Sequence, residues 1–141
     1  MAGDSTLEGM TENPYADSYA NEARERWGNT AAFRQSQERT ARYTEGDWAE
    51  IKTAGDDLNE RLAAALRAGV AAGDPAAMDL AEEHRQQLNR YFYDCGPEFH
   101  RSLGDMYVDD PRFTATYDAV TPGLATYLRD AIHANAARAS A

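Results

Sequence analysis

The apolar residues of this chain recur at steps of three and four, the spacing that places side chains along one face of an α-helix. No stretch shows the sustained alternation of apolar β-branched and polar residues that indicates a strand. The pattern therefore predicts an all-α fold of roughly six to seven helices. Its most regular part predicts a long amphipathic helix over about 45–68, with an apolar face formed by Trp48, Ile51, Gly55, Leu58, Leu62, Ala65 and Gly69.

Each of the five prolines follows a residue suited to begin or break a helix. Proline is tolerated at the first helical position, because its missing N–H would have no helical partner there. An Asn, Asp or Thr directly before it can cap the helix with a side-chain oxygen. Five helix starts are therefore predicted, at Asn13-Pro14, Asp74-Pro75, Gly96-Pro97, Asp110-Pro111 and Thr121-Pro122.

The same pattern divides the chain into a tail, two short helices and a helical core. Residues 1–12 are polar and predict a disordered tail. Residues 13–41 predict two short helices with thin apolar faces, and such helices are marginal without tertiary packing. We expect this segment to be mobile and to fold over a ligand as a lid. Residues 42–141 predict the helical core that binds the ligand.

The stretch His84–Val108 concentrates the unusual side chains of the chain. It holds the only cysteine, Cys95, the histidines His84 and His100, and the aromatic residues Tyr91, Phe92, Tyr93, Phe99 and Tyr107. A helical apolar stripe runs into the sequence Asp-Cys-Gly-Pro at 94–97, breaks, and resumes. We interpret this stretch as the wall of a ligand site.

Composition narrows the class of partner. The formal net charge of −10 argues against nucleic acid, whose binding depends on cationic side chains, and against anionic membrane surfaces. No apolar run approaches the roughly 20 residues that span a bilayer, and the polar N-terminus lacks the features of a signal peptide. One cysteine forms no internal disulfide. We therefore expect a monomer in the reducing cytoplasm.

Catalysis and metal binding find little support in the sequence. His84 and His100 lack the spacing of a metal motif, and a core histidine with a hydrogen-bond partner is the common alternative. Cys95 precedes a predicted helix start, which favours a thiolate, whereas the adjacent Asp94 opposes one and a buried inert cysteine is frequent. We expect no enzyme, no catalytic residue, no metal and no cofactor.

The aromatic content leaves two interpretations open. Aromatic residues make up 10% of the chain, and eight of them are tyrosines, which combine an apolar ring with a polar tip. A cleft for a large, flat, partly polar molecule would use such side chains. Bulky aromatics filling a small helical core would give the same composition.

Three runs resemble a known family. They are YANEARERWGNTAAFRQSQERTARYTEGDW at 19–48, EEHRQQLNRYFYDCGPEFHRSLGDMYVDDPRF at 82–113 and PGLATYLRDAIHANAAR at 122–138. The chain resembles the TipAS antibiotic-recognition domain, the ligand-binding half of MerR-type regulators, over about residues 14–138. The resemblance implies a globin-like all-α fold without haem. It also implies recognition of bulky, multi-heterocyclic peptide antibiotics such as thiopeptides, giving drug recognition or resistance.

The resemblance also suggests how the antibiotic is held. It implies that thiopeptide-capturing relatives can bond covalently to a dehydroalanine of the drug through a thiol. In one member a second cysteine lies in the helix after YDCG, where this chain has Ser102. Serine adds poorly to a dehydroalanine at neutral pH, so binding is expected to be non-covalent. The proline at position 97, where a relative has Tyr, suggests a changed mouth. The expected ligand-binding residues are Trp27, His84, Tyr91, Asp94, Cys95, Phe99, His100, Ser102, Met106 and Tyr107.

Three alternatives accompany this hypothesis. The chain would be the effector-sensing half of a MerR-family transcriptional regulator separated from its DNA-binding domain, or a thiol-dependent enzyme that modifies the drug. A helical module that receives a partner helix would also display an aromatic cleft.

Overall fold

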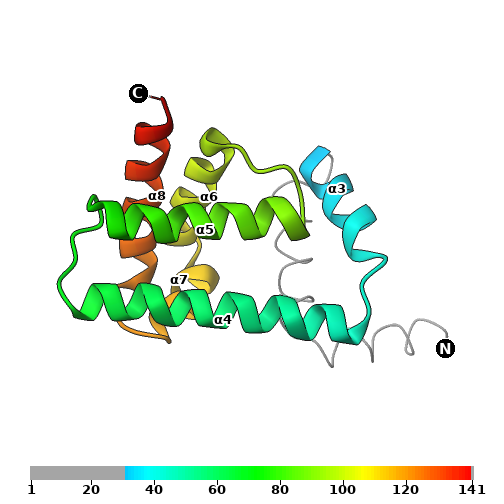
Figure 1. The fold of residues 1–141 in the computed structure, drawn as a ribbon, viewed down its shortest axis with the longest axis horizontal. Coiled ribbons are helices and arrows are strands. Elements are labelled where there is room, and N and C mark those ends of the chain that lie inside the picture. Colours follow the sequence, from blue (N-terminus) through cyan, green and yellow to red (C-terminus); the bar gives the residue numbers. More distant parts are fainter. Residues whose placement is uncertain (1–30, 141) are drawn as a thin grey trace. The chain divides into compact units, whose positions relative to one another are not determined.

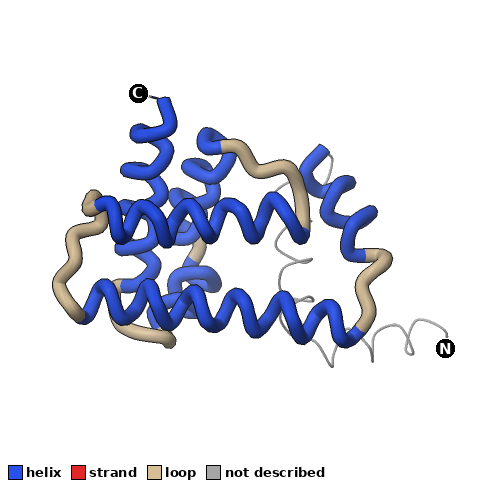
Figure 2. Tube along the Cα trace, viewed as in Figure 1, coloured by secondary structure: helices blue, strands red, loops and turns tan. Residues whose placement is uncertain are grey.

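The computed structural model describes residues 31–140. The predicted tail at 1–12 and the predicted first helix at 14–27, which contains Trp27, lie outside this range. Six helices and no strand make up the described residues, which confirms the all-α prediction (Figures 1 and 2). The helices are α3 (Ala31–Thr40), α4 (Glu45–Arg67), α5 (Pro75–Tyr91), α6 (Pro97–Asp109), α7 (Pro111–Asp118) and α8 (Leu124–Ser140).

The described residues form two compact units. The first, here the N-terminal unit, contains residues 31–53 together with Tyr91–Tyr93. The second, here the main unit, contains residues 54–90 and 94–140. The predicted division into a lid at 13–41 and a core at 42–141 stays a prediction.

The start of α4 is stabilised by a reciprocal capping box. The backbone N–H of Asp47 donates to Thr44 Oγ1 at 3.1 Å, and the backbone N–H of Thr44 donates to Asp47 Oδ2 at 2.9 Å. Both donors would otherwise lack a helical partner. This arrangement confirms the helix start predicted from the sequence.

Aspartates cap two of the helices that begin at proline. Asp74 Oδ1 accepts from the N–H of Ala76 at 2.9 Å before α5, and Asp110 Oδ1 accepts from the N–H of Arg112 at 3.0 Å before α7. Gly96 precedes α6 and offers no side-chain cap. These three predicted starts at proline are confirmed.

The start predicted at Thr121-Pro122 is wrong by two residues, since α8 begins at Leu124. Gly123 has φ of 87°, a left-handed conformation that no helix can pass through, so Pro122 stays in the preceding turn. The cap comes from earlier in the chain, where Asp118 Oδ1 accepts from the N–H of Ala125 at 3.0 Å.

The helix predicted over 75–93 ends two residues earlier than expected, at Tyr91. Phe92 and Tyr93 follow it in a turn, and both are buried. Their aromatic rings therefore contribute to a core through the turn and not through the apolar face of α5.

Helices α6 and α8 pack against each other in the main unit (Figure 1). Gly104 of α6 is buried, and a Cβ atom at this position would lie 3.4 Å from Ile132 Cδ1 and 3.5 Å from Arg129 Cα of α8. Only a small residue permits this approach. The surrounding core is aliphatic and includes Leu103, Leu124, Leu128, Ala131 and Ile132.

Two substitutions at Gly104 test how closely α6 approaches α8. Gly104→Ala places its methyl group at ordinary contact distance and gains helix propensity, so we expect unchanged stability or a gain of up to about 1 kcal/mol in the free energy of unfolding. Gly104→Leu drives a larger side chain into Arg129 and should cost about 1–3 kcal/mol. Urea denaturation measures both, and equal stability of the two variants would contradict the close packing.

Candidate functional site

Two buried histidines meet in the main unit. His84 lies on α5 and His100 on α6, with 7% and 1% of their surfaces exposed. His84 Nδ1 lies 2.9 Å from His100 Nε2, which is a hydrogen-bonding distance. On its other side, His84 Nε2 lies 3.3 Å from the hydroxyl oxygen of Tyr117 on α7. Three helices thus contribute to one chain of polar contacts.

The two imidazole rings lie nearly edge to edge. Their centroids are 5.1 Å apart and their planes are inclined by 23°. Because the bonded nitrogens are only 2.9 Å apart, they occupy the ring edges that face each other. An N–H on one ring therefore points close to the in-plane lone pair of the other, as a hydrogen bond between imidazoles requires.

Tyr107 and its aromatic neighbours pack beside His84. Tyr107 of α6 meets His84 in a T-shaped contact with centroids 5.8 Å apart. The same Tyr107 ring contacts Phe113 and Tyr117 of α7, each with a centroid distance of 5.1 Å. We call His84, His100, Tyr107, Phe113 and Tyr117 the histidine–tyrosine cluster.

Burial keeps both histidines neutral at pH 7. Removal from water lowers the pKa of His84 to about 4. The pKa of His100 falls to about 2, mainly through burial and further through the nearby positive charges of a protonated His84 and of Arg85. Each ring therefore carries one N–H and one lone pair. The pair offers hydrogen bonding without charge.

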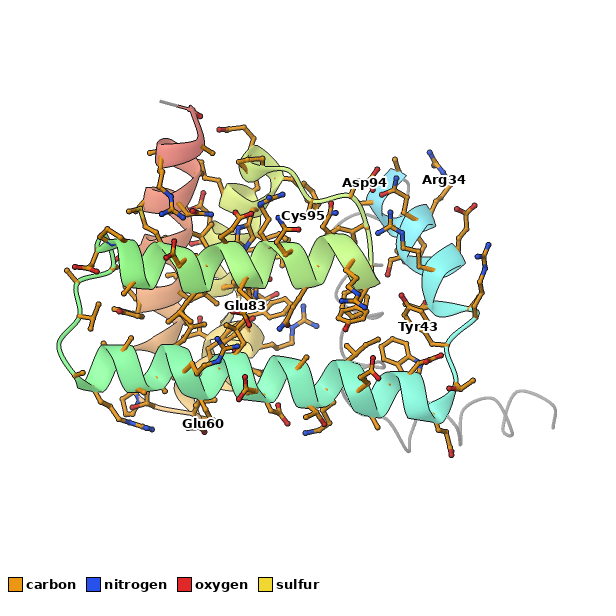
Figure 3. All side chains as sticks on the ribbon, viewed as in Figure 1. Arg34, Tyr43, Glu60, Glu83, Asp94 and Cys95 are labelled. Atoms are coloured by element: carbon orange, nitrogen blue, oxygen red, sulfur yellow. The ribbon has the colours of Figure 1, made fainter. Side chains whose placement is uncertain are left out.

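The bend between α5 and α6 is attached to α5 by two side chains. Arg85 Nη1 donates to the carbonyl oxygen of Cys95 at 2.7 Å, and Asn89 Oδ1 accepts from the Cys95 N–H at 2.9 Å. Both backbone polar groups of this residue are thus satisfied by α5. Figure 3 shows Cys95 in the segment that connects the two helices.

Glu82 orients the arginine that holds this bend. It accepts two hydrogen bonds from Arg85, at 3.0 and 2.6 Å, and one from Asn135 of α8 at 2.9 Å. The hydrogen bonds from Arg85, followed by those from Asn135 and Gln86, lower the pKa of Glu82 to about 2. The bend, α5 and α8 are therefore joined by one charged network.

The environment of Cys95 disfavours a thiolate. The residue is 1% exposed, and burial raises its pKa to about 12, although the positive charge of Arg85 opposes that rise. The thiolate is the nucleophilic form of cysteine. At neutral pH this side chain is a protonated thiol inside a core.

A second aromatic cluster lies in the N-terminal unit. The Tyr43 hydroxyl donates to the carbonyl oxygen of Tyr91 at 2.6 Å. The Tyr43 ring meets Trp48 in a T-shaped contact at 5.5 Å, and Trp48 lies against Phe92 at 6.1 Å. These contacts attach the turn after α5 to the start of α4. Figure 3 shows Tyr43 in the segment between α3 and α4.

The structure brings together only some of the predicted site residues. His84, His100 and Tyr107 belong to the histidine–tyrosine cluster. Tyr91 lies in the N-terminal unit, Asp94 and Ser102 are exposed, Phe99 is half-buried and Met106 is buried. The Ser102 hydroxyl donates to the carbonyl oxygen of Glu98 one turn earlier, at 3.4 Å.

Sequence reasoning missed Tyr117 and the residues that hold the bend. Tyr117 belonged to the apolar pattern of its helix, which gave no indication of a histidine partner. Arg85 and Asn89 are one helical turn apart on α5, and this spacing before a break in the helix was the available signal.

Among residues 31–140, no group of three or more His, Cys, Asp or Glu side chains is placed to hold a metal ion. In the same range, no helix combines the length and apolarity needed to cross a membrane.

The TipAS antibiotic-recognition domain family model matches residues 19–135. The chain belongs to this family. A solved structure described as the thiopeptide antibiotic nosiheptide in complex with TipAS, from a Streptomyces lividans multidrug resistance system, superposes with a TM-score of 0.81. It is 54% identical, and the match covers 89% of this chain and 87% of that one. The predicted globin-like all-α fold and the predicted family are confirmed.

Further relatives carry additional segments. The HTH-type transcriptional activator TipA of Streptomyces coelicolor is 56% identical over 86% of this chain and 48% of its own length. The HTH-type transcriptional activator mta of Bacillus subtilis is 34% identical over 84% of this chain and 45% of its own length. The chain spans about half the length of the curated relatives it matches.

Because the Cys95 thiol is buried, we expect it to be alkylated slowly in the native protein. In the native protein at pH 7, iodoacetamide should label this residue at least tenfold more slowly than in urea, because the thiolate is both scarce and shielded. Mass spectrometry of timed samples measures the two rates. Labelling at similar rates with and without urea would contradict the burial.

The buried histidines predict a loss of stability in mild acid. The unfolded chain binds protons at both histidines near pH 6.5, whereas folded His84 and His100 bind them only near pH 4 and pH 2. The pKa of each is lowered by folding, so the stability they contribute is complete above pH 6.5 and declines as the pH falls towards 4.

Urea denaturation at intervals between pH 7 and pH 5 measures this slope. In His100→Gln, one of the two buried histidines is absent, and the slope between pH 6 and pH 5 should fall by roughly half. An unchanged slope in the variant would show that His100 takes up its proton equally in both states.

Proposed function

We propose that this chain binds bulky, multi-heterocyclic peptide antibiotics of the thiopeptide class without forming a covalent bond, and so recognises or withdraws the drug. The supporting observation is its 54% identity, over 89% of its length, to the TipAS structure in complex with nosiheptide. A second similar structure is described as the antibiotic-binding domain of a TipA-class multidrug resistance regulator, and it is 52% identical.

Non-covalent capture is the form of binding that the side chains favour. The thiol of Cys95 is protonated and buried, and the exposed Ser102, which the resemblance aligns with a cysteine of one member, is a weak nucleophile. We therefore propose a binding protein that releases its antibiotic unchanged.

The proposed binding residues follow the sequence prediction. Aromatic and apolar contact would come from Trp27, Tyr91, Phe99, Met106 and Tyr107, and hydrogen bonding from His84, Asp94, His100 and Ser102. Cys95 would contribute packing alone. A pocket of mainly aromatic side chains with a few directional polar groups suits a flat heterocyclic ligand.

The similarity to whole regulators supports a second function. TipA and mta are HTH-type transcriptional activators, and this chain aligns with less than half of each. Under this proposal the chain senses the antibiotic for a DNA-binding partner segment, as in MerR-family regulators. A cytoplasmic location fits both functions. The coding sequence that adjoins this segment in the genome distinguishes a free-standing binder from a regulator.

Binding of nosiheptide tests the principal proposal. We expect heat of binding in calorimetry and a ligand-dependent rise in stability, about 2.7 kcal/mol when free nosiheptide is at 100 times Kd. After denaturation, mass spectrometry should show protein of unchanged mass. Neither heat nor stabilisation at micromolar protein would contradict the proposal.

The variant Ser102→Cys tests whether the antibiotic is bound covalently or non-covalently. Its exposed thiol should add across the C=C bond of a dehydroalanine of the antibiotic. The sulfur loses its proton to water and forms an S–C bond at the terminal carbon, and water returns a proton to the other carbon. The variant should then carry a covalent adduct that the wild type lacks. An adduct on wild-type protein would refute non-covalent capture.

A further inference from the structure

The buried face of α8 is apolar apart from Tyr127 and Asn135. Asn135 is 4% exposed, and a buried amide is costly unless its polar atoms find partners. Both ends of this amide do. Its nitrogen donates to Glu82 Oε1 of α5 at 2.9 Å, and its oxygen accepts from Arg138 Nη2 at 2.6 Å. A carboxylate only accepts and a guanidinium only donates, so these two partners allow the amide one orientation.

Glu82 in turn fixes the orientation of Arg85. Its carboxylate oxygens accept from Arg85 Nε at 3.0 Å and from Arg85 Nη2 at 2.6 Å. Because a guanidinium is planar, this two-point contact sets the direction of its remaining nitrogen. That nitrogen, Nη1, donates to the carbonyl oxygen of Cys95 at 2.7 Å. Successive contacts thus connect the C-terminal part of α8 to the bend before α6.

We propose that Asn135 is a positioning residue for the antibiotic-binding wall and acts on the bend before α6 through Glu82 and Arg85. This inference rests on the proposed antibiotic-binding function, in which the bend and the helix that follows it carry binding residues such as Phe99 and Ser102. Asn135 sets the direction in which α6 leaves the bend without touching the ligand itself.

The partners of Glu82 explain why Asn135 has this role. Within residues 31–140, the carboxylate accepts hydrogen bonds from Arg85, Gln86 and Asn135. Arg85 and Gln86 lie on the same helix as Glu82, so Asn135 is the partner that fixes the carboxylate relative to α8. These hydrogen bonds, with that from Arg85 the strongest cause, lower the pKa of Glu82 to about 2. Asn135 therefore donates to a charged group at neutral pH, and such hydrogen bonds are stronger than neutral ones.

A second contact joins the same two helices at the surface. Arg138 Nη1 of α8 donates to Asp79 Oδ1 of α5 at 3.0 Å, with 40% and 72% of these side chains exposed. Exposed ion pairs contribute little to stability. The position of the bend is therefore assigned to the buried amide and not to this ion pair.

Carbonyl-carbon NMR of the free protein tests the positioning role, since a carbonyl carbon moves to higher field when it loses a hydrogen bond. In Asn135→Ala, the Cys95 carbonyl carbon should move upfield, because Arg85 is no longer held against it. The Val70 carbonyl, which accepts from Tyr127 of α8 at 2.8 Å, should keep its position. Movement of both signals would show a general loosening of α8 and overturn the proposal, as would an unmoved Cys95 signal.

Glu82→Gln provides a second variant, of nearly equal size and at a partly exposed position. Its amide oxygen can still accept from Asn135, but the two-point contact with Arg85 is reduced to one. The Cys95 carbonyl carbon should again move upfield, and an unmoved signal would overturn the role of Glu82 as the intermediate.

His133→Ala is the matched control on α8. It removes the contact of 2.8 Å between His133 Nε2 and Asp105 Oδ1 of α6, which lies outside the network of Glu82 and Arg85. The Cys95 carbonyl carbon should not move in this variant. A shift as large as that in Asn135→Ala would show that any lost contact of α8 disturbs the bend, and would contradict a specific role for Asn135.

Calorimetry with nosiheptide tests the link to binding through a double-mutant cycle. Asn135→Ala should lower the affinity by about threefold or more. Arg85→Lys cannot make the two-point contact with Glu82, so in that background Asn135→Ala should lower the affinity by less than about twofold. Equal losses in both backgrounds would show that Asn135 acts independently of Arg85, and would overturn the proposal.

Failure of the proposed function gives a different result. Absence of binding heat with the wild-type protein would refute antibiotic binding, whereas the carbonyl shifts of the free protein decide the positioning of the bend without a ligand. An upfield Cys95 signal in Asn135→Ala with unchanged affinity for nosiheptide would overturn the role of Asn135 in binding.

Discussion

The hydrogen bond from Arg85 to the carbonyl oxygen of Cys95 is the contact on which the rest of the main unit depends. A helix that stops and restarts within a few residues exposes backbone groups that need partners. Here the guanidinium of Arg85 binds the Cys95 carbonyl, and Asn89 binds the Cys95 N–H. Because both come from α5, the bend is fixed to the helix that precedes it. The direction in which α6 leaves the bend follows from this attachment.

That direction determines whether the histidine–tyrosine cluster can form. His84 lies directly before Arg85 in the sequence, and His100 begins the second turn of α6. A bend fixed at Cys95 sets the separation of the two imidazoles, and Glu82 keeps Arg85 in place through a two-point contact. The charged network lies at the half-exposed edge, while the neutral pair lies inside. This division places each kind of polar group where its desolvation costs least.

Much of the fold could be predicted from residues whose effect is local. Proline predicted the starts of α5, α6 and α7, with an aspartate cap before α5 and α7 only, and Thr44 with Asp47 predicted the start of α4. The start of α8 could not be predicted, because the conformation of Gly123 and the reach of Asp118 depend on a turn. The prediction of the site rested on rare residues of the sequence, and its ligand-binding role stays a prediction. The pairing of His84 with His100 and Tyr117 could not be, since it depends on how three helices cross.

The assignment of Tyr91–Tyr93 to the N-terminal unit has a consequence for biosynthesis. These three residues pack with 31–53, although 37 residues of the main unit, 54–90, separate them along the chain. Tyr43 finds its hydrogen-bond acceptor at Tyr91, and Trp48 finds its aromatic neighbour at Phe92. As the chain leaves the ribosome, residues 31–53 therefore cannot complete their packing until the segment that ends α5 has emerged. Closing that long loop links the folding of the first helices to the folding of the bend.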